Sequence, residues 1–149
     1  MHVNLNLAFF DVNAADKVIS QFPEIDHWGI GGHSLGGVAA ALYTNTHQNT
    51  IRAIAFLASY PADDKLKNSN ILMLSLHGSN DGLATDDKIE ASIALLPAHT
   101  QFVTINGGNH GQFGSYGPQA GDNPASISPE EQWTQTADAT AALLAGLVK

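Results

Sequence analysis

The 149-residue sequence contains no cysteine, few positively charged residues and no long apolar run. Without cysteine, the chain forms no disulfide, offers no thiolate to a metal and has no cysteine nucleophile. Its 6 Lys+Arg stand against 14 Asp+Glu, for a formal net charge of -8, whereas nucleic-acid binding needs clustered cations. A membrane span needs roughly 18 consecutive apolar residues, and no segment approaches that length. We therefore expect no nucleic-acid partner and no membrane span.

The residues that are present fit one globular domain. The hydrophobic fraction of 44% is ordinary for a folded protein, and a chain of this length buries about 68–70% of its unfolded surface. Residues 1–149 are therefore treated as a single domain. Met1 is followed by no basic segment and apolar core, so no signal peptide is predicted and the cytoplasm is the default expectation.

Apolar segments of strand length alternate with helical patterns along the chain. The segments expected to form strands are 3–7, 27–32, 51–57, 71–76 and 100–105. The segments expected to form helices are 13–22 (capped by Asn13), 35–43, 85–96 (capped by Thr85 or Asp86), and 128 almost to 149, where Ser128 begins a capping sequence. The last helix is expected to bury Trp133, Leu143, Leu144 and Leu147. This alternation predicts an α/β fold with a mostly parallel sheet flanked by helices.

Residues 32–36 read Gly-His-Ser-Leu-Gly and lie between an expected strand and an Ala-rich expected helix. This G-x-S-x-G pattern, in that context, is typical of a nucleophile elbow, a sharp turn that holds a serine at a strained backbone angle. Small residues at Gly32 and Gly36 would let the strand and helix approach closely, and the helix N-terminus would direct N–H groups at Ser34. Ser34 is therefore a candidate nucleophile, and the N–H of Leu35 is a candidate oxyanion donor.

A serine nucleophile needs a base that is oriented by an acid, and in this fold class the chain order is Ser, acid, His. Asp81 follows the expected strand 71–76, and His110 follows the strand 100–105 in a glycine-rich loop over 107–127. Each has a plainer interpretation, Asp81 as part of a Gly/Asn/Asp turn and His110 as a surface histidine. Because ligands on such sheets bind beyond the carboxyl ends of the strands, the ordered set favours a Ser-His-Asp triad.

Three segments, in order, resemble motifs of the α/β-hydrolase superfamily, and in particular of small bacterial hydrolases. They are residues 31–37 (GGHSLGG), 77–82 (HGSNDG) and 107–119 (GGNHGQFGSYGPQ). The resemblance covers essentially the whole chain. It implies that Ser34 is the nucleophile, Asp81 the acid and His110 the base.

The same resemblance implies that Gln112, Phe113 and Tyr116 lie near the active site. His33, inside the first motif, is expected to line the pocket or to pack beside the elbow. We therefore take His33, Gln112 and Tyr116 as possible pocket residues.

The chain departs from the superfamily before Ser34. Members have several strands ahead of the elbow, and the loop after one of them supplies a second oxyanion N–H. Only 33 residues precede Ser34, and they hold no such motif, so we predict a minimal or N-terminally truncated α/β-hydrolase fold. Asn4, Asn6 or nearby backbone N–H groups are candidates for the second donor. An uncovered sheet edge invites pairing with another chain, so a homo-oligomer is expected.

The remaining polar residues have simpler interpretations. His77 is expected to shape the acid loop, and Asp122 with Asn123 to form a turn, with ion binding as the alternative. The other histidines lack ligand spacing, so neither a metal nor a cofactor is expected, and a histidine-rich metal site stays as an alternative. No P-loop pattern is present, and the Gly29-Ile30-Gly31 segment lacks the third glycine of a dinucleotide fingerprint.

The sequence thus predicts a serine hydrolase of small-molecule carboxylic esters with small or moderately sized acyl groups, acting through an acyl-enzyme intermediate. One alternative is a catalytically impaired or inactive remnant that serves as a binding or self-assembling module. Another is an enzyme for a lactone, thioester or amide, because specificity lies in the pocket and not in the triad.

Overall fold

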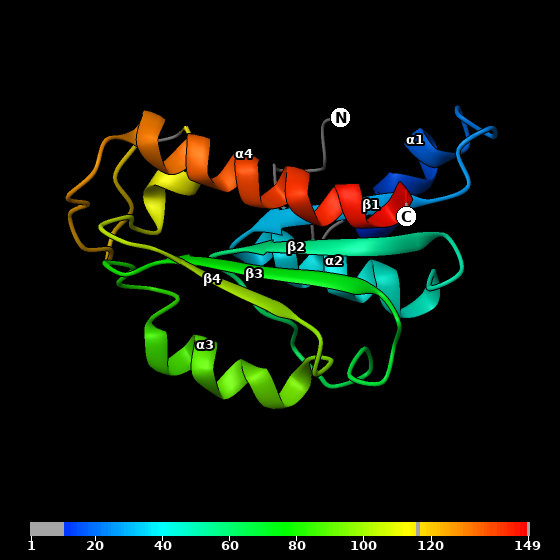
Figure 1. The fold of residues 1–149 in the computed structure, drawn as a ribbon, viewed down its shortest axis with the longest axis horizontal. Coiled ribbons are helices and arrows are strands. Elements are labelled where there is room, and N and C mark those ends of the chain that lie inside the picture. The colour runs from blue at the N-terminus through cyan, green and yellow to red at the C-terminus, as the bar shows by residue number, and fades with distance from the viewer. Residues whose placement is uncertain (1–10, 116, 149) are drawn as a thin grey trace.

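A four-stranded parallel sheet forms the centre of the molecule (Figure 1). The computed structural model describes residues 11–115 and 117–148. The strands are β1 (Trp28–His33), β2 (Ile51–Leu57), β3 (Leu72–Gly78) and β4 (Gln101–Ile105), and they lie side by side in that order. Every neighbouring pair is parallel, so all four carboxyl ends meet at one edge. The expected α/β fold is confirmed, while the strand predicted over 3–7 lies outside the described residues.

Helices cover both faces of this sheet. α4 (Pro129–Ala145), which ends in the 3-10 turn η6 (Gly146–Val148), lies on one face, and α2 (Leu35–Thr46) and α3 (Asp86–Ser92) lie on the other (Figure 1). The shorter elements are η3 (Val12–Ala15), α1 (Asp16–Ile19), η4 (Ile93–Leu95) and η5 (Gly111–Phe113). In the part of the chain that the structure describes, no helix is both long and apolar enough to cross a membrane.

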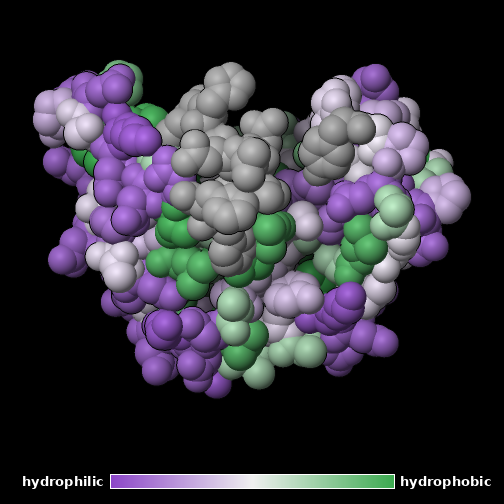
Figure 2. Space-filling view, turned by 180° about the vertical axis from the view of Figure 1, so that it is seen from behind, coloured by the Kyte–Doolittle hydropathy of each residue, from purple (hydrophilic) through white to green (hydrophobic). Residues whose placement is uncertain are grey.

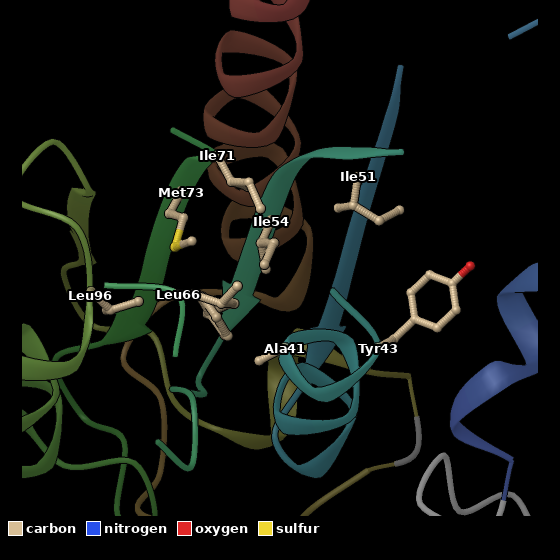
Figure 3. Close-up of a cluster of buried hydrophobic side chains, with 9 residues drawn as sticks. Ala41, Tyr43, Ile51, Ile54, Leu66, Ile71, Met73 and Leu96 are labelled. Carbon is tan, nitrogen blue, oxygen red and sulfur yellow. The ribbon is translucent and has the colours of Figure 1, made fainter. Parts of the chain in front are cut away.

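Two hydrophobic clusters, one on each side of the sheet, make up most of the core. The cluster on the α2 side joins that helix to β2, β3 and the β2–β3 connection (Figure 3); its buried members are Ala41, Tyr43, Ile51, Ile54, Phe56, Leu66, Ile71, Met73 and Leu96. The cluster on the α4 side consists of Ala53, Ala55, Leu74, Leu76, Ile105 and Leu143. Side chains of β2 and β3 alternate between the two clusters, as expected for central strands that are covered on both faces.

The helix predicted over 13–22 is wrong in extent. The chain there forms the 3-10 turn η3 and then the single turn α1, which ends at Ile19, and Asn13 is not its cap. Val12, Ala15 and Ile19 pack against the α2-side cluster, whereas Phe22 is 42% exposed. Because short helices depend on tertiary packing for their stability, the helix stops where its side chains no longer reach the core.

The last helix begins as predicted but buries fewer side chains than expected. Ser128 and Glu131 form a reciprocal capping box at its start, and Leu143 is 4% exposed. Trp133 and Leu144 are wrongly predicted as buried, because they are 41% and 42% exposed. Leu144 lies over Gly29, to which its Cδ2 comes so close that a Cβ there would be 2.6 Å away. Leu144 therefore lies at the edge of the described sheet, where β1 is the outermost strand.

Candidate active site

Ser34 lies at the turn between β1 and α2, with φ 52° and ψ −123°. Such a positive φ is strained for a residue with a side chain, and surrounding hydrogen bonds hold it. The Ser34 N–H donates to Leu57 O at 2.9 Å, and the N–H of Gly37 donates to Ser34 O at 3.0 Å. The Ser59 hydroxyl also donates to Ser34 O, at 2.6 Å. The backbone N–H of Ser34 is thereby held by β2, and its backbone C=O is held by Gly37 and Ser59.

Glycine at two positions lets strand and helix meet at this turn. A Cβ on Gly32 would lie 2.2 Å from the backbone carbon of Gly36, and one on Gly37 would lie 2.4 Å from the Ser59 hydroxyl oxygen. A Cβ on Gly36 would meet nothing within 4 Å. The expectation that Gly36 must itself be small is therefore wrong, because only its backbone takes part in the close contact.

Asp81 and His110 form a buried pair at the carboxyl ends of β3 and β4. The Nδ1 of His110 lies 3.1 and 3.0 Å from the two carboxylate oxygens of Asp81, and the two side chains are 2% and 0% exposed. The N–H groups of Leu83 and Ala84 donate to Asp81 Oδ1 at 2.8 and 2.7 Å. An acceptor that binds Nδ1 leaves the Nε2 of the same ring to exchange a proton.

The electrostatic balance around Asp81 favours its ionised form. Burial by itself raises the pKa of this carboxyl, but the hydrogen bonds from His110, Leu83 and Ala84 outweigh burial, and the pKa is lowered from its ordinary value. Asp81 is therefore a carboxylate at neutral pH and can stabilise a positive charge on His110.

Ser34 and His110 border the same small cavity. Its volume is about 190 Å³, and its lining is mostly apolar, from Leu35, Val38, Ala58, Ser59, Tyr60, Leu83 and Ala84. The Nε2 of His110 is buried and has no hydrogen-bond partner in the described part of the chain. The free nitrogen of the histidine and the strained serine thus share one hollow, although no hydrogen bond joins them.

Leu35 is the first residue of α2, so its N–H has no acceptor within the helix. Together with the positive end of the helix dipole, this N–H is suited to bind a developing oxyanion next to Ser34. Asn4 and Asn6, the candidates for a second donor, lie outside the described residues.

His33 packs directly against His110. Its ring centroid lies 4.6 Å from that of His110 and 6.0 Å from that of Phe113, onto which it stacks. Burial, and next the charge of His110, lower the pKa of His33 from 6.5 to about 4. At neutral pH, His33 is therefore an uncharged wall of the site. Gln112 lies in η5, two residues after His110, and its side-chain amide donates to Ile127 O at 3.3 Å. It lines the larger hollow beside the long loop and not the cavity of Ser34, and Tyr116 lies outside the described residues.

Two residues that sequence analysis did not assign to the site hold the base loop in place. Asp122 accepts N–H groups from Gly82, His110 and Gly111. The amide of Gln132, which is 0% exposed, accepts from Asn109 N at 3.0 Å and donates to Asn109 O at 2.8 Å. One feature of the sequence could have identified Asp122: it is the only carboxylate in the loop over residues 107–127.

His77 has an acidic partner on a neighbouring element. Its Nε2 lies 2.9 Å from Asp86 Oδ1, which connects β3 to the start of α3. Across residues 11–115 and 117–148, no group of three His, Asp or Glu side chains is arranged to hold a metal ion.

The hollows in the described part of the chain include two larger ones that lie away from Ser34. One, of about 570 Å³, is lined by the loop over residues 109–125 and the start of α4. The other, of about 340 Å³, is apolar and lies between η3, α1, β1 and α2. Neither is lined by Ser34 or His110. The smaller cavity is therefore the candidate active site in spite of its size.

The elbow, the Asp–His pair and the parallel sheet define a chain of the α/β-hydrolase class. The sequence model of the alpha/beta hydrolase family matches residues 1–134, and the protein belongs to this family. No curated protein sequence matches it.

Solved structures of hydrolases share the fold at low sequence identity. A thermophilic esterase from Thermogutta terrifontis matches with a TM-score of 0.70 and 12% identity, over 91% of this chain and 71% of its own. Est1E from Butyrivibrio proteoclasticus, solved with ferulic acid bound, matches with a TM-score of 0.65 and 15% identity, over 95% and 69%. A CIB-like hydrolase from Thermoplasma acidophilum matches with a TM-score of 0.60 and 18% identity, over 86% and 58%. The chain thus spans about three fifths to seven tenths of the length of these proteins.

Proposed function

We propose that this protein hydrolyses carboxylic esters through Ser34, His110 and Asp81. One observation carries the proposal: the buried pair of Asp81 and His110 leaves a single unpartnered imidazole nitrogen in a structure where that ring borders the same cavity as Ser34. A serine at a strained turn, an imidazole and a buried carboxylate are the three groups that acyl transfer by a serine requires.

The reaction proceeds in two half-reactions. The Ser34 Oγ attacks the ester carbonyl carbon while Nε2 of His110 takes the hydroxyl proton, and the N–H of Leu35 binds the carbonyl oxygen as it becomes negative. The tetrahedral intermediate expels the alcohol, which receives that proton from His110, and an acyl-enzyme on Ser34 remains. His110 then takes a proton from water, the hydroxide attacks the acyl carbon, and the carboxylic acid leaves as Ser34 regains its proton.

The cavity favours small or moderately sized acyl groups. Its volume of about 190 Å³ and its lining by Val38, Tyr60 and Leu83 suit a short apolar chain. The same machinery acts on lactones, thioesters and amides, and the cavity as described does not distinguish an ester from these.

A second candidate is an impaired hydrolase that has kept the site without full activity. It is favoured by the described residues, among which we identify one oxyanion donor, the N–H of Leu35. Losing one such donor costs about 10²- to 10³-fold in rate in a well-studied protease.

Labelling with a fluorophosphonate separates the two candidates, because covalent modification requires an activated serine. We expect labelling of the wild type at Ser34, none in Ser34→Ala, and turnover of p-nitrophenyl acetate that Ser34→Ala abolishes. Ser20→Ala, on an exposed serine at the end of α1, is the matched control and should label normally. An unlabelled wild type supports the impaired form, and unchanged turnover in Ser34→Ala contradicts the assignment.

We further propose that the free edge of β1 pairs with a second copy of the chain. Within the described residues β1 is hydrogen-bonded to β2 alone, and apolar side chains lie on the face seen from behind in Figure 2. Unpaired strand edges are sites of association between chains. Light scattering at tens of micromolar should show a dimer or larger species, and a clean monomer contradicts this expectation.

A further inference from the structure

Among the described residues, the carboxylate of Asp122 accepts four hydrogen bonds, all from backbone N–H groups. Its Oδ1 accepts from Gly82 at 3.0 Å, from His110 at 3.2 Å and from Asn123 at 2.9 Å. Its Oδ2 accepts from Gly111 at 2.8 Å. Among the described residues, Asp122 belongs to no group of three His, Asp or Glu side chains that could hold a metal ion.

These donors belong to the two loops that carry the acid and the base. Gly82 follows Asp81 directly, and Gly111 follows His110 directly. A single carboxylate thereby joins the backbone next to the acid, 40 residues away in the chain, to the backbone of the base itself. We propose that Asp122 is a positioning residue, which sets the distance and orientation between His110 and Asp81; this inference rests on the proposed function.

The packing around Asp122 leaves little freedom to the two loops. A Cβ on Gly82 would lie 2.5 Å from Gly121 O and 3.0 Å from the Cα of Asp122. Gly121 has φ +87°, a left-handed conformation that glycine adopts without strain. The acid loop and the segment before Asp122 are thus in direct backbone contact, so the carboxylate position is fixed by the fold.

The distribution of donors requires a carboxylate in particular. Both oxygens of Asp122 accept, whereas an asparagine offers one acceptor and an NH₂ group that donates only. An asparagine that keeps its oxygen toward Gly82 and His110 would direct its NH₂ at the N–H of Gly111. Asp122→Asn should therefore lose one contact and Asp122→Ala all of them, which gives a graded series.

A merely structural role for Asp122 makes a different prediction. A residue that only stabilises the loop lowers the melting temperature, and folded molecules then react at the normal rate. A positioning residue lowers kcat in the folded enzyme with KM nearly unchanged, because misplacement of the base weakens transition-state stabilisation. The two roles are separated by kinetics on fully folded protein.

The matched control is Asn80→Ala. Asn80 Nδ2 donates to Pro124 O at 3.1 Å, so this variant also removes a contact between the acid loop and the long loop, but it leaves the N–H groups of His110 and Gly111 untouched. Comparison with Asp122→Ala therefore separates positioning of the base from general loosening of the loop.

We expect the rate of fluorophosphonate labelling, and kcat for p-nitrophenyl acetate, to fall about tenfold in Asp122→Asn and about 10²-fold in Asp122→Ala. KM should stay within twofold of the wild type, and Asn80→Ala should stay within twofold in every constant. Normal rates in Asp122→Asn, or equal losses in Asn80→Ala, overturn the proposal. If Asp122→Ala fails to fold, Asp122→Asn decides.

A second measurement is independent of catalysis. In proton NMR spectra, the Nδ1–H of His110, which donates to Asp81, should give a far-downfield resonance in the wild type and in Asn80→Ala. In Asp122→Ala this resonance should be lost, because the proton exchanges with water. The amides of Gly82, His110 and Gly111 should also exchange at least tenfold faster in that variant. If fluorophosphonate does not label the wild type, the proposed function fails, but these NMR signals still test the role of Asp122. Signals in Asp122→Ala that equal those of the wild type overturn the positioning role.

Discussion

Among the described residues, side-chain carboxylates and an amide bind the backbone of the loops beyond β3 and β4, and no carboxylate or amide does so around β1. Beyond β3 and β4, the carboxylates of Asp81 and Asp122 and the amide of Gln132 all bind backbone groups of the acid and base loops. Around β1, the glycines Gly29 and Gly31 are exposed, and α1 is a single turn. Asp81 and His110, the proposed acid and base, therefore lie in a rigid half of the molecule that these contacts hold together, and Ser34 lies at its boundary with the β1 half.

The difference indicates how each half orients its proposed catalytic groups. His110 and Asp81 are oriented by hydrogen bonds to each other and to the loops that follow β3 and β4. Ser34 is oriented by the backbone of one turn, in which Gly32 allows the close contact. Substitutions in the first half should therefore act mainly on rate, and substitutions in the second half mainly on stability.

The largest effect is expected from Asp81→Asn, in the rigid half. The asparagine NH₂ would face either His110 or the N–H groups of Leu83 and Ala84, so the imidazole loses its acceptor or the loop loses its anchor. We expect kcat to fall by about 10⁴-fold, as in the equivalent substitution of a studied serine protease. Steady-state kinetics test this, with Asp63→Asn at an exposed ion pair to Lys65 as the control. A loss of less than tenfold would show that Asp81 is not the acid.

The next effect is expected from Gly32→Ala, in the β1 half. The new Cβ would lie 2.2 Å from Gly36 C, and overpacking of this kind costs about 3 kcal/mol of stability. Gly36→Ala is the matched partner, because its Cβ meets nothing and alanine favours a helix by up to about 1 kcal/mol over glycine. In urea unfolding, the free energy of unfolding should be highest for Gly36→Ala, intermediate for the wild type and lowest for Gly32→Ala. The reverse order would contradict the elbow geometry.

A smaller effect concerns His33, which lies where the two halves meet. Its pKa is lowered to about 4 in the fold from 6.5, so between these values the unfolded chain holds a proton that the native protein lacks. Stability therefore rises with pH from about 4 to 6.5 and is lost as the pH falls through that window. His33→Gln should lose less stability than the wild type between pH 7 and pH 5 in urea unfolding.

His27→Gln, at an exposed histidine, is the control for that comparison and should keep the wild-type pH dependence. An equal pH dependence in His33→Gln and the wild type would show that His33 does not contribute.

The smallest effect is expected from Tyr43→Phe, where α2 meets α1. The Tyr43 hydroxyl, which lies at the edge of the core and faces away from it (Figure 3), donates to Asp16 Oδ1 at 2.6 Å. Burial and then this hydrogen bond raise the pKa of Tyr43, so the hydroxyl stays protonated as a donor. Its removal should cost about 1 kcal/mol in urea unfolding and leave kcat unchanged. A large loss of kcat would show that the β1 half is coupled to the site more tightly than its contacts indicate.

Much of the fold could be predicted because local chemistry determines it. The apolar run over 51–57 forms β2 with the same bounds, and Ser128 with Glu131 forms the expected capping box. The strand over 27–32 was displaced by one residue. Patterns within a few residues sufficed in these cases, since a buried strand or a helix start depends on its own side chains.

The failures concern contacts that depend on distant parts of the chain. Leu144 has the periodicity of a buried residue, but it lies over Gly29 at the edge of the described sheet. Asp122 is recognisable in the sequence as an isolated charge. Its proposed role, however, depends on the fold of the long loop, which brings it next to Gly82. The buried amide of Gln132 has no counterpart in hydrophobic patterning, because a polar side chain is buried only where the fold supplies its partners.

The contact of Gln132 with Asn109 gives α4 an influence on chemistry that this helix does not touch. Gln132 lies in the first turns of α4 and binds both backbone groups of the residue before the base. Detachment of the helix from the sheet would therefore release the base loop, even with the strands intact. On heating, activity should therefore be lost at the temperature at which the helix undocks, even where the strands are still folded.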